Sequence, residues 1–275
     1  MKACLNNSEH NYKGDETSPL GLGYSPKKLD CGTFMVGKDE NLWFVKKNKN
    51  NVWSKIDFNN LSKDSYVPVF FPEIELLEKD REETGIEEKF GGSKPFFMEG
   101  ETWPKDKDGI SMTFICQFFN QLSRSKKELI RIFMNVDNEK DIFDLNVHVS
   151  KINLNKQNLK KQITIENKEV KTAYPTYLIK KWTKSKELKS FKYICDKYGF
   201  DEKSEILNQF YDKSEFVPSF HTKVGGTPTF CQYYDNIEKK KHLFQFTECD
   251  VMPYAFGDCG IAHIFADFEF YWDCY

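Results

Sequence analysis

The chain has 275 residues, a formal net charge of −2 and an aromatic content of 16%, which is enough apolar material to bury a full core in one or two domains. No run approaches the roughly 18 apolar residues that a membrane span requires, and polar residues follow Met1 closely. We therefore predict neither a membrane span nor a secretory signal. The eight cysteines show no CxxC pairs, which predicts free and mostly buried thiols.

Charge is distributed unevenly along the chain. Residues 151–192 contain twelve Lys and three Glu, a local charge of +9, whereas residues 246–275 contain six acids and no Lys or Arg, a local charge of −6. Aromatic residues interleaved with the lysines of 151–192 suit base stacking, so nucleic-acid binding through this segment is one alternative function. A charge run is more often a solvated face, and the segment contains no recognised binding motif.

The N-terminal part of the chain divides into an arm and a small β unit. Residues 1–30 are polar and lack periodicity, which predicts a flexible arm. Apolar residues alternate within residues 31–60 around two turn signals, which predicts a three-stranded meander that must pack on another element. Its aromatic residues Trp43 and Trp53 are candidates for contacts with a protein partner. Residues 57–67 read as a linker.

The rest of the chain, residues 68–275, is predicted to form one domain. Pro72, Ile74 and Leu77 suit the start and face of a helix, and strands are expected at 112–119, 129–136 and 144–152. The second half is predicted to contain an amphipathic helix ending at Gly199, a short helix over 202–212, and strands near 242–249 and 261–270. The predicted fold class is α+β, mostly antiparallel β with an internal duplication.

A short phrase occurs twice and is the main basis for expecting that duplication. Gly91 and Gly92 lie in Lys-Phe-Gly-Gly-Ser-Lys-Pro, and Gly225 and Gly226 lie in Lys-Val-Gly-Gly-Thr-Pro. Paired glycines permit positive φ, so each phrase either turns the chain or presents backbone N–H groups to an anion. The turn is favoured, because neither copy contains a GxGxxG or GK[ST] pattern.

Further polar and aromatic residues accompany the two phrases. The structural reading is that these residues lock a strand core, and the functional reading is that they line a pocket between the halves. An Asp between glycines is typical of a turn, although it can also act as an acid or base. The residues concerned are Trp103, Gln117, Gln232, Gln245, Gly257, Asp258 and Gly260.

Catalytic and metal-binding chemistry receives little support from the residue spacing. Asp258, His221 and Cys231 are weak catalytic candidates by residue type alone. Cysteines and histidines gather in the last 45 residues, but their spacing matches no zinc pattern. We expect no metal and no cofactor.

The order of these motifs resembles the YwqG-like family, of unknown function, over roughly residues 68–275. The resemblance implies an α+β fold with an internal duplication, and it provides no catalytic residues to transfer. The chain departs from the family at Phe256, where a Trp usually precedes the Gly-Asp pair. The motifs are Phe-Gly-Gly-x-x-Pro, Trp103-Pro104, Phe114-Ile-Cys-Gln117 and Leu129-Ile-Arg-Ile-Phe133, then Lys223-Val-Gly-Gly-Thr-Pro228, Cys231-Gln232, Leu243-Phe-Gln245 and Gly257-Asp-Cys-Gly260.

The N-terminal β unit resembles a short element found in proteins of large DNA viruses. With the Lys- and Asn-rich composition, this implies a giant-virus origin and a location in the host cytoplasm or the virion. The leading hypothesis is a non-enzymatic binding or assembly module that contacts other proteins or itself, with Trp272 as a further contact candidate. The alternative is a hydrolase-like enzyme with a cleft between the two halves.

Overall fold

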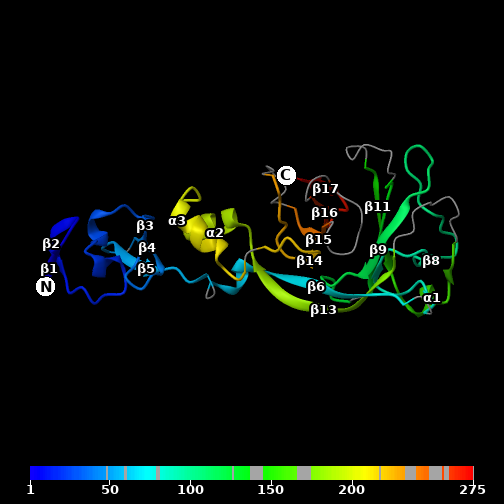
Figure 1. The fold of residues 1–275 in the computed structure, drawn as a ribbon, viewed down its shortest axis with the longest axis horizontal. Coiled ribbons are helices and arrows are strands. Elements are labelled where there is room, and N and C mark those ends of the chain that lie inside the picture. Colours follow the sequence, from blue (N-terminus) through cyan, green and yellow to red (C-terminus); the bar gives the residue numbers. More distant parts are fainter. Residues whose placement is uncertain are drawn as a thin grey trace. The chain divides into compact units, whose positions relative to one another are not determined.

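The computed structural model describes residues 1–47, 49–58, 61–78, 81–125, 127–136, 145–165, 175–216, 218–232, 240–247, 256 and 260–274 (Figure 1). The chain forms two compact units, which are described separately below. The first contains Met1–Val67 and Glu187–Pro218, and the second contains Pro68–Lys186 and Ser219–Tyr275. Each unit is therefore built from two separate stretches of sequence.

Strands predominate among the described residues. The helices are α1 (Lys156–Leu159), α2 (Phe191–Tyr198) and α3 (Glu205–Asp212), and short 3₁₀ turns occur at Pro19–Leu22, Pro26–Lys28 and Lys63–Ser65. The strands are β1 (Lys2–Cys4), β2 (Asn7–Tyr12), β3 (Phe34–Val36), β4 (Leu42–Lys46), β5 (Val52–Lys55), β6 (Tyr66–Leu76), β7 (Lys89–Phe90), β8 (Phe97–Met98), β9 (Thr113–Phe119), β10 (Glu128–Met134), β11 (Val147–Asn153), β12 (Gln162–Ile163), β13 (Tyr177–Leu188), β14 (Lys223–Gly225), β15 (His242–Thr247), β16 (Ile261–Phe265) and β17 (Phe270–Asp273).

The first unit combines the predicted meander with the two larger helices. Strands β3, β4 and β5 form the expected antiparallel three-stranded sheet. Helix α2 begins after Ser190, whose side chain accepts a hydrogen bond from the Tyr193 amide, and it ends at Gly199 in the left-handed conformation, as predicted. Phe34 of the sheet packs edge-on against Phe200, which follows α2. The meander therefore buries its apolar face against a segment that is distant in sequence.

Residues 1–30, predicted as a flexible arm, contain regular structure. Strands β1 and β2 form an antiparallel hairpin. The segment that follows is fixed by a reciprocal pair of hydrogen bonds, in which the Asn6 side chain donates to the Ser25 carbonyl at 2.8 Å and accepts from the Ser25 amide at 2.7 Å. Strands β1 and β2 consist mostly of polar residues, so the sequence lacks the apolar alternation that would have predicted them.

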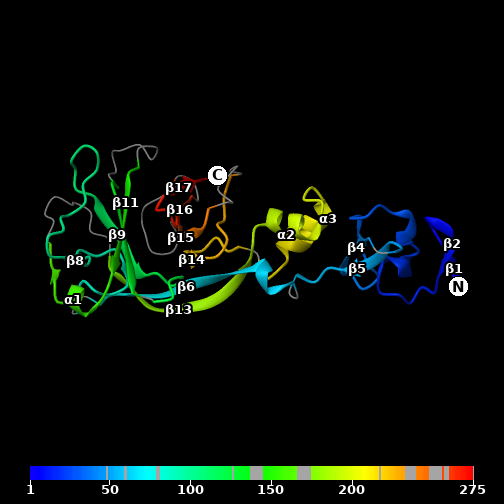
Figure 2. The same cartoon turned by 180° about the vertical axis from the view of Figure 1, so that it is seen from behind.

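The second unit contains a ten-stranded sheet in the order β11-β10-β9-β7-β13-β6-β14-β15-β16-β17. Four strands lie on each side of the central pair β13 and β6, which run next to each other in Figures 1 and 2. Within this sheet, β7, β9, β10 and β11 on one side follow one another in the chain, and so do β14, β15, β16 and β17 on the other side. The chain is thus mostly antiparallel β, the coarser part of the predicted fold class.

The helix predicted to begin at Pro72 is wrong, because β6 occupies this segment. Ile74 and Leu77 have helical spacing, but three or four positions cannot separate a helix from a strand. The preceding β-branched and aromatic residues, Val67, Val69 and Phe70, favour a strand. Phe70 pairs with Val224 of β14, so contacts with a segment about 150 residues away decide the structure.

The core of the second unit is aromatic and joins the two sides of the sheet. Phe118 of β9 and Phe244 of β15 have ring centroids 4.6 Å apart, and both side chains are fully buried. Phe90 of β7 also stacks on Phe244, at 6.4 Å. Buried aromatic pairs of this kind contribute beyond their area alone, so the two sides of the sheet stabilise one another.

Candidate functional site

Both glycine pairs adopt the left-handed conformation that L-residues avoid. The φ angles are 65° and 87° at Gly91 and Gly92, and 72° and 69° at Gly225 and Gly226. Gly91 and Gly92 follow β7, whereas Gly225 is the last residue of β14 and Gly226 follows it; each of these short strands begins with a lysine. The glycines therefore turn the chain where these strands end.

A buried glutamine fixes the first of these turns. Gln117 lies opposite Lys89 in the pairing of β9 with β7. Its side-chain amide donates to the carbonyls of Gly85 and Glu87, at 2.9 and 2.7 Å, and its oxygen accepts from the Phe96 amide at 2.9 Å. These three bonds tie the segments before and after the glycine pair to the sheet.

The second turn is fixed by the same bonds at matching positions. Gln245 lies opposite Lys223 in the pairing of β15 with β14. Its side-chain amide donates to the carbonyls of Ser219 and His221, which precede Lys223 by the same intervals as in the first copy. Its oxygen accepts from the Thr229 amide at 3.0 Å.

The two lysines that begin these strands are fully buried. Lys89 Nζ donates to the Lys94 carbonyl at 2.7 Å, and Lys223 Nζ donates to the Thr227 carbonyl at 2.8 Å. Lys89 is also 2.5 Å from a carboxylate oxygen of Glu83, and burial lowers its pKa. Each lysine therefore holds the loop that follows its glycine pair, which is a structural role.

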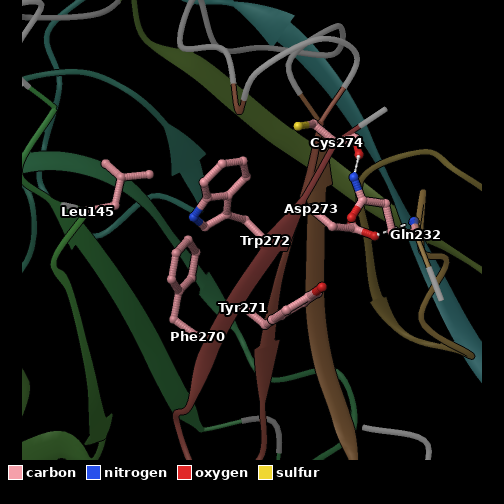
Figure 3. Close-up of a pocket in the computed structure, with 7 residues that line it drawn as sticks. All are labelled: Leu145, Gln232, Phe270, Tyr271, Trp272, Asp273 and Cys274. Atoms are coloured by element: carbon pink, nitrogen blue, oxygen red, sulfur yellow. Dashed lines mark hydrogen bonds between the residues drawn. The ribbon is translucent and has the colours of Figure 1, made fainter. Parts of the chain in front are cut away.

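A pocket of about 510 Å³ lies at β17, on the acidic C-terminal part of the chain. In Figure 3 the side chains of Phe270 and Trp272 point to one side of the strand, and those of Tyr271 and Asp273 to the other. The described lining residues are Leu145, Gln232, Phe270, Tyr271, Trp272, Asp273 and Cys274.

Gln232 anchors the polar side of this pocket. Its backbone amide donates to Asp273 Oδ2 at 2.8 Å, and its side-chain amide donates to the Cys274 carbonyl at 2.7 Å (Figure 3). Asp273 is only 4% exposed. Its other oxygen, Oδ1, lies 4.0 Å from His263 Nε2 on the neighbouring strand β16. Among the described residues, neither of these two atoms has a hydrogen-bond partner.

A second buried histidine continues this line of polar groups away from the pocket. His242 Nε2 lies 3.5 Å from His263 Nδ1, and His242 Nδ1 lies 2.7 Å from the carbonyl oxygen of Gly225. Burial, and then the cation of Lys223, lower the pKa of His242 to about 3. Burial, with His242 and Lys223, lowers the pKa of His263 well below its usual range, so both rings are neutral at neutral pH. Burial raises the pKa of Asp273.

Several residues proposed from the sequence are engaged within the chain. Trp103 is 9% exposed and donates through Nε1 to the Met112 carbonyl at 2.6 Å. Trp43 and Trp53 are half-buried, and their indole N–H groups donate to Asp39 and to the Tyr24 carbonyl. Trp272 lines the pocket and is half-buried.

The weak catalytic candidates are not brought together among the described residues. His221 is exposed, and Cys231 is half-buried and adjacent in sequence to Gln232 of the pocket. Asp258 and Gly257 lie outside the described residues. An added Cβ at Gly260 would clash with the Phe256 carbonyl, so this glycine permits a close backbone approach.

A smaller pocket of about 250 Å³ lies between the two sides of the sheet. Glu128 and Lys151 contribute from β10 and β11, Leu243 contributes from β15, and Lys241 immediately precedes β15. The two glycine pairs are not among its described lining residues. Within the described parts of the chain, we find no group of three potential metal ligands and no helix long and apolar enough to cross a membrane.

Comparison with known proteins identifies the family. The profile of a family described as "Domain of unknown function (DUF1963)" matches residues 88–269, about two thirds of the chain. The chain belongs to this family. The DUF1963 match includes both glycine pairs and both glutamines but ends before β17, so residues 270–274 of the pocket lie beyond it. No curated protein matches the chain.

Four residues of these polar clusters were not predicted from the sequence as site residues. For Lys89 and Lys223 a usable signal was present, because a lysine begins each copy of the glycine phrase. His263 and Asp273 were not signalled as a pair. They meet only through the pairing of β16 with β17, which places Asp273 opposite Ile261, two residues before His263.

Proposed function

We propose that this DUF1963 member is a non-enzymatic binding module whose ligand occupies the pocket at β17. The observation that carries the proposal is the combination of aromatic walls, Phe270 to Trp272, with a carboxylate oxygen of Asp273 that has no partner among the described residues. Ligand sites are typically apolar pockets with a few oriented polar groups. The catalytic alternative, a hydrolase, lacks a nucleophile and base in contact among these residues.

We also propose that the sheet arose by duplication and belongs to the YwqG-like type. The matching bonds of Gln117 and Gln245 support this, as does the strand order on either side of β13 and β6. A viral origin with a cytoplasmic or virion location is a further proposal, supported by the Lys- and Asn-rich composition and the N-terminal β unit.

The binding function is tested by screening the ¹⁵N-labelled full chain against a fragment library by NMR. We expect hits that shift the amide signals of Gln232 and of residues 271–274. Trp272→Ala should weaken these hits by about tenfold, the effect of losing one aromatic contact of about 1.4 kcal/mol. The control, Trp53→Ala in the first unit, should leave them unchanged. Because the shifts are mapped on the unmodified chain, the test does not depend on the variant folding. Hits that map elsewhere, or no hits at millimolar concentration, would overturn the proposal.

A further inference from the structure

We propose that the pocket at β17 binds a primary amine, whose ammonium group bridges Asp273 Oδ1 and His263 Nε2. The apolar body of the amine would lie against Tyr271, whose side chain points to the same side of β17 as that of Asp273 (Figure 3). This inference rests on the proposed binding function and names its ligand class. It follows from the hydrogen positions that the buried polar groups impose on one another.

The line of buried groups fixes which nitrogen of each histidine carries the hydrogen. The Gly225 carbonyl can only accept, so His242 Nδ1 at 2.7 Å is the protonated nitrogen. Because the ring is neutral, His242 Nε2 is an acceptor and faces His263 Nδ1. His263 Nδ1 therefore carries the hydrogen of this contact and donates to His242 Nε2. His263 Nε2 therefore carries a lone pair.

Two acceptors consequently face each other across 4.0 Å: the lone pair of His263 Nε2 and the carboxylate oxygen Oδ1 of Asp273. A proton on Asp273 does not join them, because a direct O–H···N bond requires roughly 2.5–3.0 Å. A nitrogen that carries at least two hydrogens can lie about 2.8 Å from both atoms and donate to each. Such a group satisfies two buried atoms that have no partner among the described residues.

The carboxylate of Asp273 favours a cationic donor over a neutral one. Hydrogen bonds from a cation to a carboxylate are about twice as strong as neutral ones. Aromatic faces, such as that of Tyr271 on the same side of β17 as Asp273, also attract ammonium groups.

The other side of the sheet contains a comparable arrangement that is complete. Arg131 lies opposite Gln117, as His263 lies opposite Gln245. The Arg131 guanidinium donates to a carboxylate oxygen of Glu101 at 2.7 Å. At this position the first side of the sheet has Arg131, a cation with several hydrogen-bond donors. The second side has His263, whose Nε2 lone pair faces Asp273. An amine from outside would supply the same chemistry.

The test uses the full chain and three probes of similar shape: benzylamine, benzyl alcohol and benzoate. We expect benzylamine to bind at residues 271–274 at least about tenfold more tightly than benzyl alcohol near neutral pH, with no binding of benzoate. Asp273→Asn should weaken benzylamine binding by about 10- to 100-fold. Asp267→Asn, the same change at an exposed position on the same hairpin, should leave it unaltered.

A second measurement does not depend on any variant. Imidazole ¹⁵N NMR of the unmodified chain should show His263 protonated at Nδ1, with the Nε2 signal shifting when benzylamine binds. A hydrogen on Nε2, equal affinity for benzyl alcohol, or unchanged binding by a folded Asp273→Asn protein would overturn the inference. In the last two cases the pocket would still bind ligands, so the proposed binding function would survive. Failure of every probe and fragment to map to the pocket would reject both.

Discussion

Acidification should destabilise this protein through His242. The ring is 5% exposed, and burial with the nearby cation of Lys223 lowers its pKa from 6.5 to about 3. In the unfolded chain the ring has its ordinary pKa. Between about pH 6.5 and about pH 3 the unfolded chain therefore binds a proton at His242 that the folded protein does not bind. The contribution of neutral His242 is therefore fully present above about pH 6.5 and is lost as the pH falls toward 3.

The magnitude follows from proton linkage. At about pH 5 the unfolded chain lies about 1.5 pH units below the ordinary histidine pKa, so the free energy of unfolding should fall by about 2 kcal/mol. His263 acts in the same direction, because its pKa is also lowered by burial. The whole protein should therefore lose more than this, and a variant is needed to isolate His242.

His242→Asn is the suitable variant, because its amide N–H can still donate toward the Gly225 carbonyl but cannot titrate in this range. Urea unfolding at about pH 8 and about pH 5 should show a loss smaller by about 2 kcal/mol in the variant than in the unmodified protein. His221→Asn, at an exposed position, should behave like the unmodified protein. Equal losses in the unmodified protein and His242→Asn would refute the reasoning.

Two further substitutions test the glycine turns. Gly225→Ala should cost at least about 2 kcal/mol of stability, since its φ is 72° and an added Cβ would lie 2.8 Å from a backbone oxygen; Gly109→Ala, with φ of 80° and open space, should cost only about 1 kcal/mol. Lys89→Met should cost about 3–5 kcal/mol by leaving the Glu83 carboxylate without its buried cation, whereas Lys94→Met should cost less than about 1 kcal/mol. Urea unfolding measures both pairs, and equal costs within a pair would contradict the assigned roles.

Local patterns in the sequence predicted the elements whose structure is decided locally. Strands β9 and β10 are mostly apolar runs interrupted by Gln117 and Arg131, and α2 has its own cap at Gly199, so these elements could be placed from short-range signals. The glycine pairs were likewise predicted as turns. The helix predicted at Pro72 is wrong because the structure of this segment is not decided locally. Strand β6 is defined by neighbours in the sheet that lie more than 100 residues away.

For the candidate site, the sequence predicted only which types of residue it contains. An acidic, aromatic C-terminal segment was evident, and Trp272 was named as a contact residue. The pairing of Asp273 with His263 depends on the register between β16 and β17, and the neutrality of His263 depends on burial. Neither quantity is available from a pattern of residue types, because a shift of one residue would move Asp273 to the other face of the strand.

The two sides of the sheet indicate where specificity would reside. Gln117 and Gln245 make the same bonds and lie within the DUF1963 match, so they account for features of the shared fold. On the first side, Arg131 forms an ion pair with Glu101 of the same chain. On the second side, the carboxylate that faces His263 belongs to β17, beyond the matched residues. If the pocket binds an amine, the ligand preference is therefore a property of this chain's C-terminal strand and need not extend to other DUF1963 proteins.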